Sequence, residues 1–197
     1  MARRFRIFDI TISLALLTIL IPVFLVIVAV VRLSSSGPAF FQQERMGKDL
    51  VPFTLVKFRS MRVSLDSQSF SAGSSHRVTL VGAALRKTKL DELPQLLNVL
   101  RGDMSIVGTR PELEKYVHLF PVEYKQLLSY PPGITSPASI KYRNEEKLLS
   151  DSNDPERLYI GSILPEKIAC DLAYLESRTL RTDMGLIMQT IRTVLTP

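Results

Sequence analysis

Two adjacent carboxylates, Asp91 and Glu92, are the residues whose types and spacing most clearly suit catalysis. They lie in the segment KLDELPQL, two residues before Pro94, and basic residues crowd the upstream side. A carboxylate can attack phosphorus and so split one difficult displacement into two easier ones. A Mg²⁺ ion held by one carboxylate would offset the repulsion between the other carboxylate and an anionic diphosphate. Neighbouring residues of a helix point about 100° apart, so we expect the two carboxylates to have different roles.

A purely structural explanation of the same pair is also open. Acidic residues are favoured in the first turn of a helix, where they offset the helix dipole, and proline is tolerated there. The segment DELPQLLNVL, residues 91–100, would then be the start of a helix with leucines on one face. In that case each acidic residue contributes only stability, about 0.3–1 kcal/mol.

The segments around the pair predict a domain of helices and short strands. Residues 39–47 and 52–61 are rich in aromatic and β-branched side chains and are expected to be strands. Helical patterns cover residues 78–87, 112–130 with a break near Pro121, 165–178 and 180–195. Loops or turns are expected at residues 33–38, 66–76, 101–111 and 131–135. We expect one face of the last helix either to be buried in the core or to lie on a lipid surface. That face carries Leu180, Met184, Ile187, Met188, Ile191 and Leu195.

An uncharged apolar run covers residues 10–31. As a helix it would be roughly 33 Å long, close to the hydrocarbon thickness of a bilayer. The run is longer than the apolar part of a typical signal peptide, so we expect it to stay in the membrane. Pro22, near its centre, removes a helical hydrogen bond and predicts a break. The run could be a kinked helix that crosses the bilayer, or a re-entrant hairpin whose two ends leave on the same face.

Basic residues flank this run on both sides. Arg3, Arg4 and Arg6 precede it and Arg32 follows it. Because positive flanks tend to stay in the cytoplasm, a re-entrant hairpin satisfies both sides. The favoured organisation is a membrane-embedded re-entrant helix over residues 1–35 and a small cytoplasmic catalytic domain over residues 36–197, with a plain span of the bilayer as the alternative. The predicted fold class is α/β, mostly helical, with amphipathic surface helices and short strands.

Composition limits the partners. The 197 residues include 25 lysines and arginines against 19 acidic residues, a net charge of +6, which favours phosphorylated substrates, a lipid surface or nucleic acid. The single cysteine, Cys170, excludes an internal disulfide and is expected to be a small buried core residue. His76 and His118 lie in no metal-ligand spacing, and we expect both to be structural.

Four segments in this order resemble one known family: GPAFFQQERMGK, FTLVKFRSMR, LRKTKLDELPQLLNVLRGDMSIVGTRP and PGIT. Together they are similar to the bacterial sugar transferases, the monotopic phosphoglycosyl transferases, over nearly the whole chain. The resemblance implies transfer of a phosphosugar from a UDP-sugar to polyprenyl phosphate, usually undecaprenyl phosphate, with release of UMP. It also implies Mg²⁺ as cofactor, a place in the bacterial inner membrane and the first membrane step of glycan assembly.

The resemblance assigns roles to individual residues. Asp91 would be the nucleophile that holds the phosphosugar covalently, Glu92 the metal ligand, and Pro22 the break in the membrane helix. Positions matching basic family residues, expected to contact phosphate or nucleotide, are Arg86, Arg110, Lys57, Arg59 and Arg143. This chain has Ile21 where the family commonly has serine before the proline, and Thr109 where the family has GPRP. The segment after PGIT also departs from the family pattern, so the sugar stays undefined, as does a homo-oligomeric state.

Other classes of function compete with this one. A membrane-anchored basic scaffold would explain the apolar run and the charge, but not the Asp-Glu pair. A phosphohydrolase with an aspartate nucleophile would share the chemistry but would need no lipid-embedded hairpin. Nucleic acid is not an expected partner, because charge without a recognisable motif is a poor indication.

Overall fold

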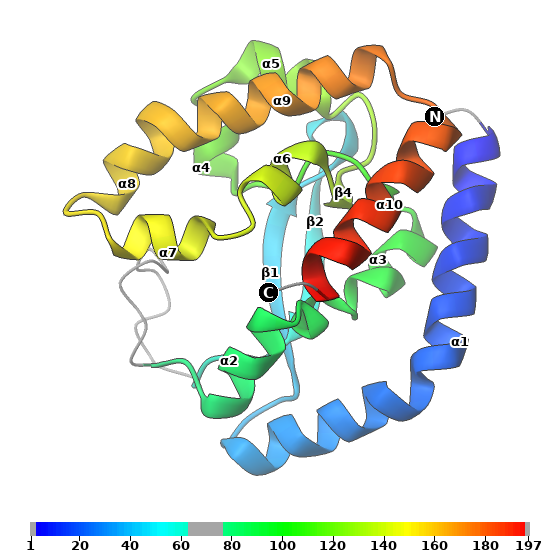
Figure 1. Cartoon of the computed structure of the whole chain (residues 1–197), viewed down its shortest axis with the longest axis vertical. Helices are drawn as coiled ribbons and strands as arrows, with labels where there is room; N and C mark the ends of the chain where they lie inside the picture. Colours follow the sequence, from blue (N-terminus) through cyan, green and yellow to red (C-terminus); the bar gives the residue numbers. More distant parts are fainter. Residues whose placement is uncertain (1–2, 63–76, 196–197) are drawn as a thin grey trace.

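The computed structural model describes residues 3–62 and 77–195, and this part of the chain is mostly helical with a few short strands (Figure 1). The predicted mixture of helices and short strands is therefore confirmed. The loop predicted over residues 66–76, and with it His76, lies outside the described residues.

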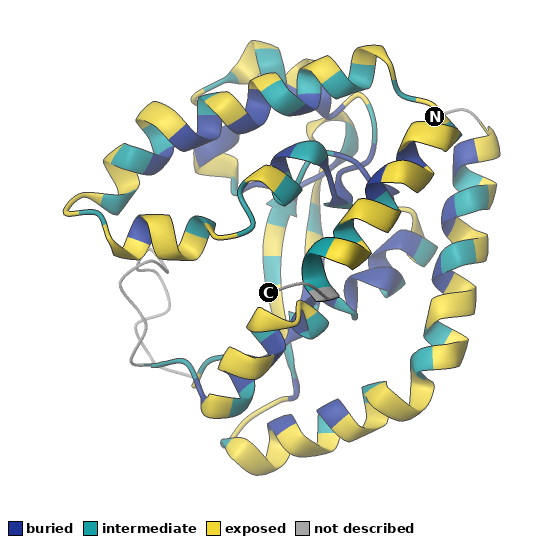
Figure 2. Cartoon of the chain, in the orientation of Figure 1, coloured by how far each residue is buried: buried dark blue, intermediate teal, exposed yellow. Residues whose placement is uncertain are grey.

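The longest element is the N-terminal helix α1, Arg3–Ser34, which contains Pro22. Figure 1 shows α1 bent into two parts, as expected when a proline removes a helical hydrogen bond. We call the residues before Pro22 the first arm and those after it the second arm. By length and composition, α1 is the one helix of the described residues that could cross a membrane. Exposed residues cover most of its outer side (Figure 2), including Ile19, Leu25 and Val26.

The first arm is fixed to the rest of the domain by polar contacts. Arg6 donates hydrogen bonds to the carbonyl oxygens of Val99 and Leu100, the latter at 2.7 Å, at the end of α3, Gln95–Arg101. One oxygen of the buried Asp9 accepts from the backbone N–H of Ile106 at 3.1 Å. A charged side chain at each of these sites holds the arm against the domain.

The second arm is fixed to the same domain. Its residues Ile27 and Val31 are buried against Phe58. Arg59 donates hydrogen bonds to the carbonyl oxygens of Val31 at 3.3 Å and Ser35 at 2.6 Å. Both ends of the long apolar helix are thus attached to one domain.

The main sheet is an antiparallel hairpin of β1, Phe40–Met46, and β2, Pro52–Phe58, close to the predicted strands. A second pair, β3, Ser105–Val107, and β4, Gly133–Thr135, is parallel. Loops or turns were expected there, and that prediction was wrong. Three-residue strands are too short to show an alternating pattern, and their pairing depends on partners distant in the sequence.

The predicted helices are confirmed with small changes of boundary, including the break at Pro121, which opens α5. A π-helical turn, Tyr159–Ile163, leads into α9. The helices beyond α1 and α3 are α2 Leu80–Lys87, α4 Glu114–Val117, α5 Pro121–Leu127, α6 Pro137–Lys141, α7 Glu145–Ser150, α8 Pro155–Leu158, α9 Leu164–Glu176 and α10 Leu180–Leu195.

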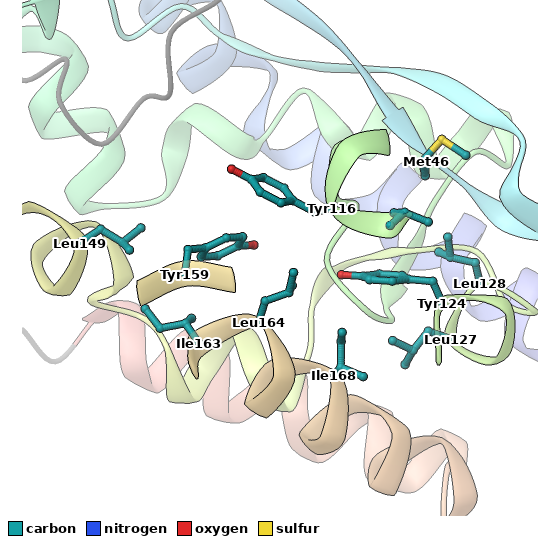
Figure 3. Packing of buried hydrophobic residues seen from close by; sticks show 11 residues of the cluster. Met46, Tyr116, Tyr124, Leu127, Leu128, Leu149, Tyr159, Ile163, Leu164 and Ile168 are labelled. Atoms are coloured by element: carbon teal, nitrogen blue, oxygen red, sulfur yellow. The ribbon is translucent and has the colours of Figure 1, made fainter. Parts of the chain in front are cut away.

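A core cluster between α4, α5, the π turn and α9 holds one side of the domain together. Figure 3 shows the rings of Tyr116, Tyr124 and Tyr159 among its leucines and isoleucines. The edge-to-face pair of Tyr116 and Tyr159, with ring centroids 5.0 Å apart, is of the kind favoured by aromatic quadrupoles. This cluster supports the segment that follows Arg110.

The structure bears on two expectations about burial. Of the two alternatives for the apolar face of α10, core or lipid surface, burial in the core is wrong: Met184, Met188 and Ile191 are each more than two-fifths exposed, whereas Asp183 and Leu186 are buried. The opposite side of α10 points inward, and there the carboxylate of Asp183 pairs with Arg178 at 2.9 Å. Cys170 is only half-buried on α9, not a core residue.

Candidate active site

A sharp turn presents the two carboxylates. Helix α2 ends at Lys87, and Lys89 then adopts a left-handed backbone with φ of 56°. That conformation is costly for a residue with a side chain and is found most often where function requires it. The turn starts a new helical segment, in which Asp91 and Glu92 occupy a single 3₁₀ turn just before α3. The carboxylates do precede a helix, as both explanations of the pair predict.

The turn is held in place on two sides. Leu90 and Leu93 pack in the cluster formed with the second arm of α1. On the other side, the buried Asn98 of α3 accepts a hydrogen bond from the backbone N–H of Val56 at 3.1 Å and donates to the carbonyl of Thr54 at 2.8 Å. The carboxylates therefore have fixed positions relative to β2 and to the apolar helix.

Asp91 is buried at 5% exposure, and its Oδ1 makes no hydrogen bond to any residue that the structure describes. Burial raises the pKa of Asp91 above its ordinary value, and the charge of Glu92 raises it further. Nearby cations, Lys57 first among them, oppose this rise. An unpartnered carboxylate oxygen in a buried site destabilises the fold. The purely structural explanation of Asp91 does not account for it.

Glu92 forms a bidentate ion pair with Arg110. The guanidinium donates to the two carboxylate oxygens at 2.6 and 3.2 Å. Burial alone would raise the pKa of Glu92, but the charge and hydrogen bonds of Arg110 lower it to about 2. Glu92 in turn raises the pKa of Arg110. Glu92 is thus a carboxylate at any physiological pH, while Arg110, with 38% of its side chain exposed, can still reach a ligand.

A second basic side chain faces this pair from β2. Lys57 lies beside Arg45, Gln95 and Arg110 around a polar cavity of about 20 Å³, room for roughly one water molecule. Burial lowers the pKa of Lys57 to about 8, and the charge of Arg110 contributes to the decrease. Cationic groups gathered next to two carboxylates favour an anionic ligand such as a diphosphate.

Of the other predicted basic residues, Arg86 and Arg59 are bound to groups other than the two carboxylates. Arg86 donates to the Ser60 hydroxyl at 2.9 Å and to Glu146 at 2.7 Å. Arg59 holds the end of α1, as described above. Arg143 is half-buried in the turn between α6 and α7. For these three arginines a phosphate contact stays a prediction, whereas the structure brings Lys57 and Arg110 together with Asp91 and Glu92.

The donor set can be tested against a Mg²⁺ ion. No group of three or more acidic, histidine or cysteine side chains suited to a metal occurs in the part of the chain that the structure describes. Mg²⁺ commonly binds through one or two carboxylates, with waters and substrate phosphates completing its shell. The remaining lone pairs of Glu92 fit such a site, and the free Oδ1 of Asp91 lies on the neighbouring residue. The residues present therefore suit an ion that arrives with a diphosphate substrate.

Sequence reasoning missed three residues next to the site. The alternation of a strand puts Arg45 on the same face as Lys57's partner Phe41, so its place could have been found. Glu112, two residues after Arg110, forms a buried ion pair with Lys167 at 3.1 Å. They are far apart in the chain, and no local pattern marks them.

Comparisons with known proteins point in one direction. A sequence model described as bacterial sugar transferase matches residues 2–197. The uncharacterized sugar transferase EpsL of Bacillus subtilis (strain 168) is 36% identical over 190 residues, covering 96% of this chain and 86% of the relative. The exopolysaccharide production protein PSS of Rhizobium leguminosarum bv. phaseoli is 37% identical over 201 residues, 97% of this chain and 94% of the relative. The UDP-glucose:undecaprenyl-phosphate glucose-1-phosphate transferase of Caulobacter vibrioides is 32% identical over 198 residues, 98% and 70% of the two chains.

Proposed function

The chain belongs to the bacterial sugar transferase family, and from this premise we propose that it transfers a phosphosugar from a UDP-sugar to undecaprenyl phosphate. UMP is the second product, and the lipid-linked diphosphate sugar begins a bacterial glycan such as an exopolysaccharide. The names of related proteins from Caulobacter vibrioides and Aeromonas hydrophila support the lipid acceptor. The single observation that carries the proposal is the buried, unpartnered Oδ1 of Asp91 beside the Glu92–Arg110 pair.

The proposed reaction has two displacements at one phosphorus. In the first, a carboxylate oxygen of Asp91 bonds to the β-phosphorus of the UDP-sugar, and the bond from that phosphorus to the bridging oxygen breaks, which releases UMP. In the second, a phosphate oxygen of the acceptor bonds to the same phosphorus, and the Asp91 carboxylate leaves. Lys57 and Arg110 lie where they can pair with the charged oxygens of the diphosphate.

Glu92 is the residue proposed to hold Mg²⁺. When bound, the ion would neutralise charge on the diphosphate. Without a bound ion, Arg110 keeps Glu92 ionised and oriented, because the bidentate pair lowers the pKa of the carboxyl. Asp91, whose pKa is raised, stays free of such a partner and keeps its nucleophilic oxygen available.

The surroundings of the turn favour a lipid acceptor. Leu90 and Leu93, on either side of the carboxylates, pack against the second arm of α1. An apolar hollow of about 260 Å³ between α1 and α3 is lined by Leu17, Ile21, Phe24, Leu25 and Leu97. The exposed apolar side chains of α10 add a further surface suited to lipid. A nucleophile placed next to such surfaces can meet a phosphate at the membrane interface.

We further propose that α1 enters the bacterial inner membrane and returns to its cytoplasmic face, where the catalytic domain lies. The support is that both arms are attached to one domain, through Arg6 on one side and Arg59 on the other. A straight helix of this length would separate its ends by roughly the thickness of a bilayer. Positive flanks on both sides agree with a cytoplasmic location for both.

The topology predicts a labelling result. Cysteines introduced at position 2 and in place of Ser35, in a variant lacking Cys170, should both resist a membrane-impermeant thiol reagent applied to intact cells. Both should react once the inner membrane is opened. Pro22→Ala restores a helical hydrogen bond and should shift part of the population to a full span. Labelling of positions 2 and 35 from opposite faces, in the protein that keeps Pro22, would refute the hairpin.

A pH profile tests the role of Lys57. The folded-state pKa of Lys57 is lowered from 10.5 to about 8, so its cation is present below pH 8 and is lost as the pH rises through that value. We expect kcat/KM for the UDP-sugar, which reports the free enzyme, to fall above pH 8. Lys57→Arg, which stays charged, should retain kcat/KM there. Lys48→Arg on the same hairpin is the control and should keep the decline. A decline that persists in Lys57→Arg would contradict this assignment.

The overall function is tested by UMP release from a panel of UDP-sugars, with and without polyprenyl phosphate. Release that depends on the lipid supports the transferase, and the best donor identifies the sugar. Release of inorganic phosphate without lipid would instead indicate a phosphohydrolase. A folded protein that releases neither product with any donor would favour the membrane-anchored scaffold.

A further inference from the structure

Two short segments near the site share a pattern that one lysine connects. Arg110 is followed two residues later by Glu112, and Arg143 is followed two residues later by Glu145. Lys167 of α9 makes ion pairs with both carboxylates, at 3.1 Å to Glu112 and 3.0 Å to Glu145. The ammonium group therefore ties together the two segments that carry Arg110 and Arg143.

This junction is buried. Lys167 and Glu112 are 6% and 7% exposed, and Glu112 also accepts a hydrogen bond from the Tyr159 hydroxyl at 2.7 Å. Tyr159 belongs to the π-helical turn before α9, and Figure 3 shows its ring inside the core cluster. Insertions of this kind in helices are common at functional sites. Here the π turn and α9 deliver a hydroxyl and an ammonium to the same carboxylate.

The junction also fixes the backbone that follows Arg110. The carbonyl of Glu112 accepts from the backbone N–H of Met46 at 3.0 Å, and Arg45 donates to the carbonyl of Pro111 at 3.4 Å. Burying several charges contributes little net stability compared with apolar packing. The buried charges contact the segment that carries Arg110, so they can fix its position.

We propose that Lys167 is a positioning residue that sets the spacing between the Arg110 and Arg143 segments, so that both guanidiniums can hold the diphosphate of one donor molecule. This inference rests on the proposed function, because it takes the diphosphate of a UDP-sugar as the ligand. Lys167 itself touches no substrate and acts through Glu112 and Glu145. Both carboxylates are needed, since either alone would fix only one of the two segments.

The test measures UDP affinity and thermal unfolding together on purified full-length protein. We expect Lys167→Met to weaken UDP binding about tenfold, since small displacements of binding groups have large effects. Glu145→Gln removes one link at a partly exposed side chain and should weaken UDP binding severalfold with little change in the unfolding temperature. Lys167→Arg, which keeps the charge, should recover part of the affinity. A role confined to stability would change unfolding but not the UDP affinity of folded protein.

The matched control is Glu156→Gln. Glu156 of α8 makes an exposed ion pair with Lys115 of α4, at 2.7 Å, without touching the junction. It should bind UDP as wild type does. If folded Lys167→Met and Glu145→Gln both match this control, the inference is wrong, although wild type binds UDP and releases UMP. If wild type does neither, the proposed function itself fails, and the inference fails with it.

Discussion

We expect the Asp91→Asn variant to form no covalent phosphosugar adduct and to lose at least about a thousandfold in turnover, as loss of a nucleophile does in other enzymes. The amide keeps the size of the carboxylate and most of its hydrogen bonding but is a far poorer nucleophile. The measurement is intact-protein mass after incubation with the UDP-sugar and Mg²⁺ in the absence of lipid. Wild type should show the mass of one phosphosugar, and added polyprenyl phosphate should remove it.

The same substitution should change stability in the opposite direction to activity. The pKa of Asp91 is raised in the folded protein, first by burial and then by Glu92. The folded state therefore disfavours the charged form, and a carboxylate at neutral pH destabilises the fold. Replacing it with a neutral amide should leave the unfolding temperature unchanged or raise it. The helix-dipole explanation predicts the reverse, a loss of about 0.3–1 kcal/mol in stability with catalysis intact.

The control for Asp91 is Asp49→Asn, which changes an exposed aspartate on the β1–β2 connection. It should form the adduct as wild type does. Glu92→Gln retains the nucleophile, and its residual activity should respond to raised Mg²⁺. If Asp91→Asn still acquires the phosphosugar, the nucleophile is another residue and the two-displacement mechanism through Asp91 is wrong.

Long periodic elements of this fold could be predicted from sequence, and short ones could not. The helical pattern of residues 180–195 coincides with α10 because it extends over four turns. The strands β3 and β4 have three residues each and depend on Gly133, where a Cβ would lie 2.1 Å from the backbone nitrogen of Gly108. Only the folded arrangement shows why both positions need glycine. The inward face of α10 was also hidden, because it buries the charged pair of Asp183 and Arg178 beside Leu186.

The site divides in the same way. Asp91, Glu92 and Arg110 lie in segments whose residues are close in sequence or match a family motif, and the structure brings them together. Arg59 was also expected to contact phosphate, but it donates to oxygens of Val31 and Ser35 at the end of α1, which no local pattern reveals. Lys167 lies 55 residues from Glu112. Its role depends on tertiary structure alone, and α9 viewed as a helix gives no indication of it.

The second large effect concerns Arg110. We expect Arg110→Ala to lower kcat/KM for the UDP-sugar by about 30- to 150-fold, or roughly 2–3 kcal/mol, the range for hydrogen bonds to charged groups. Arg110→Lys should recover little, because an ammonium cannot replace a bidentate guanidinium. The exposed Arg101→Ala in α3 is the matched control and should behave as wild type.

Arg110 could act on the diphosphate directly or only through Glu92, and a double-mutant cycle separates the two. If Arg110 only orients Glu92, the double variant Glu92→Gln/Arg110→Ala should be no worse than Glu92→Gln. If it also binds the diphosphate, UDP affinity measured without Mg²⁺ should fall in Arg110→Ala and persist in Glu92→Gln, which removes a repelling charge.

The single Arg110→Ala variant also leaves a buried carboxylate without its partner. Its Glu92 pKa should rise from about 2, and the stability from that carboxylate, present above its unfolded pKa, should be lost at neutral pH. If wild type and folded Arg110→Ala bind UDP with equal affinity, the role of Arg110 is restricted to holding Glu92.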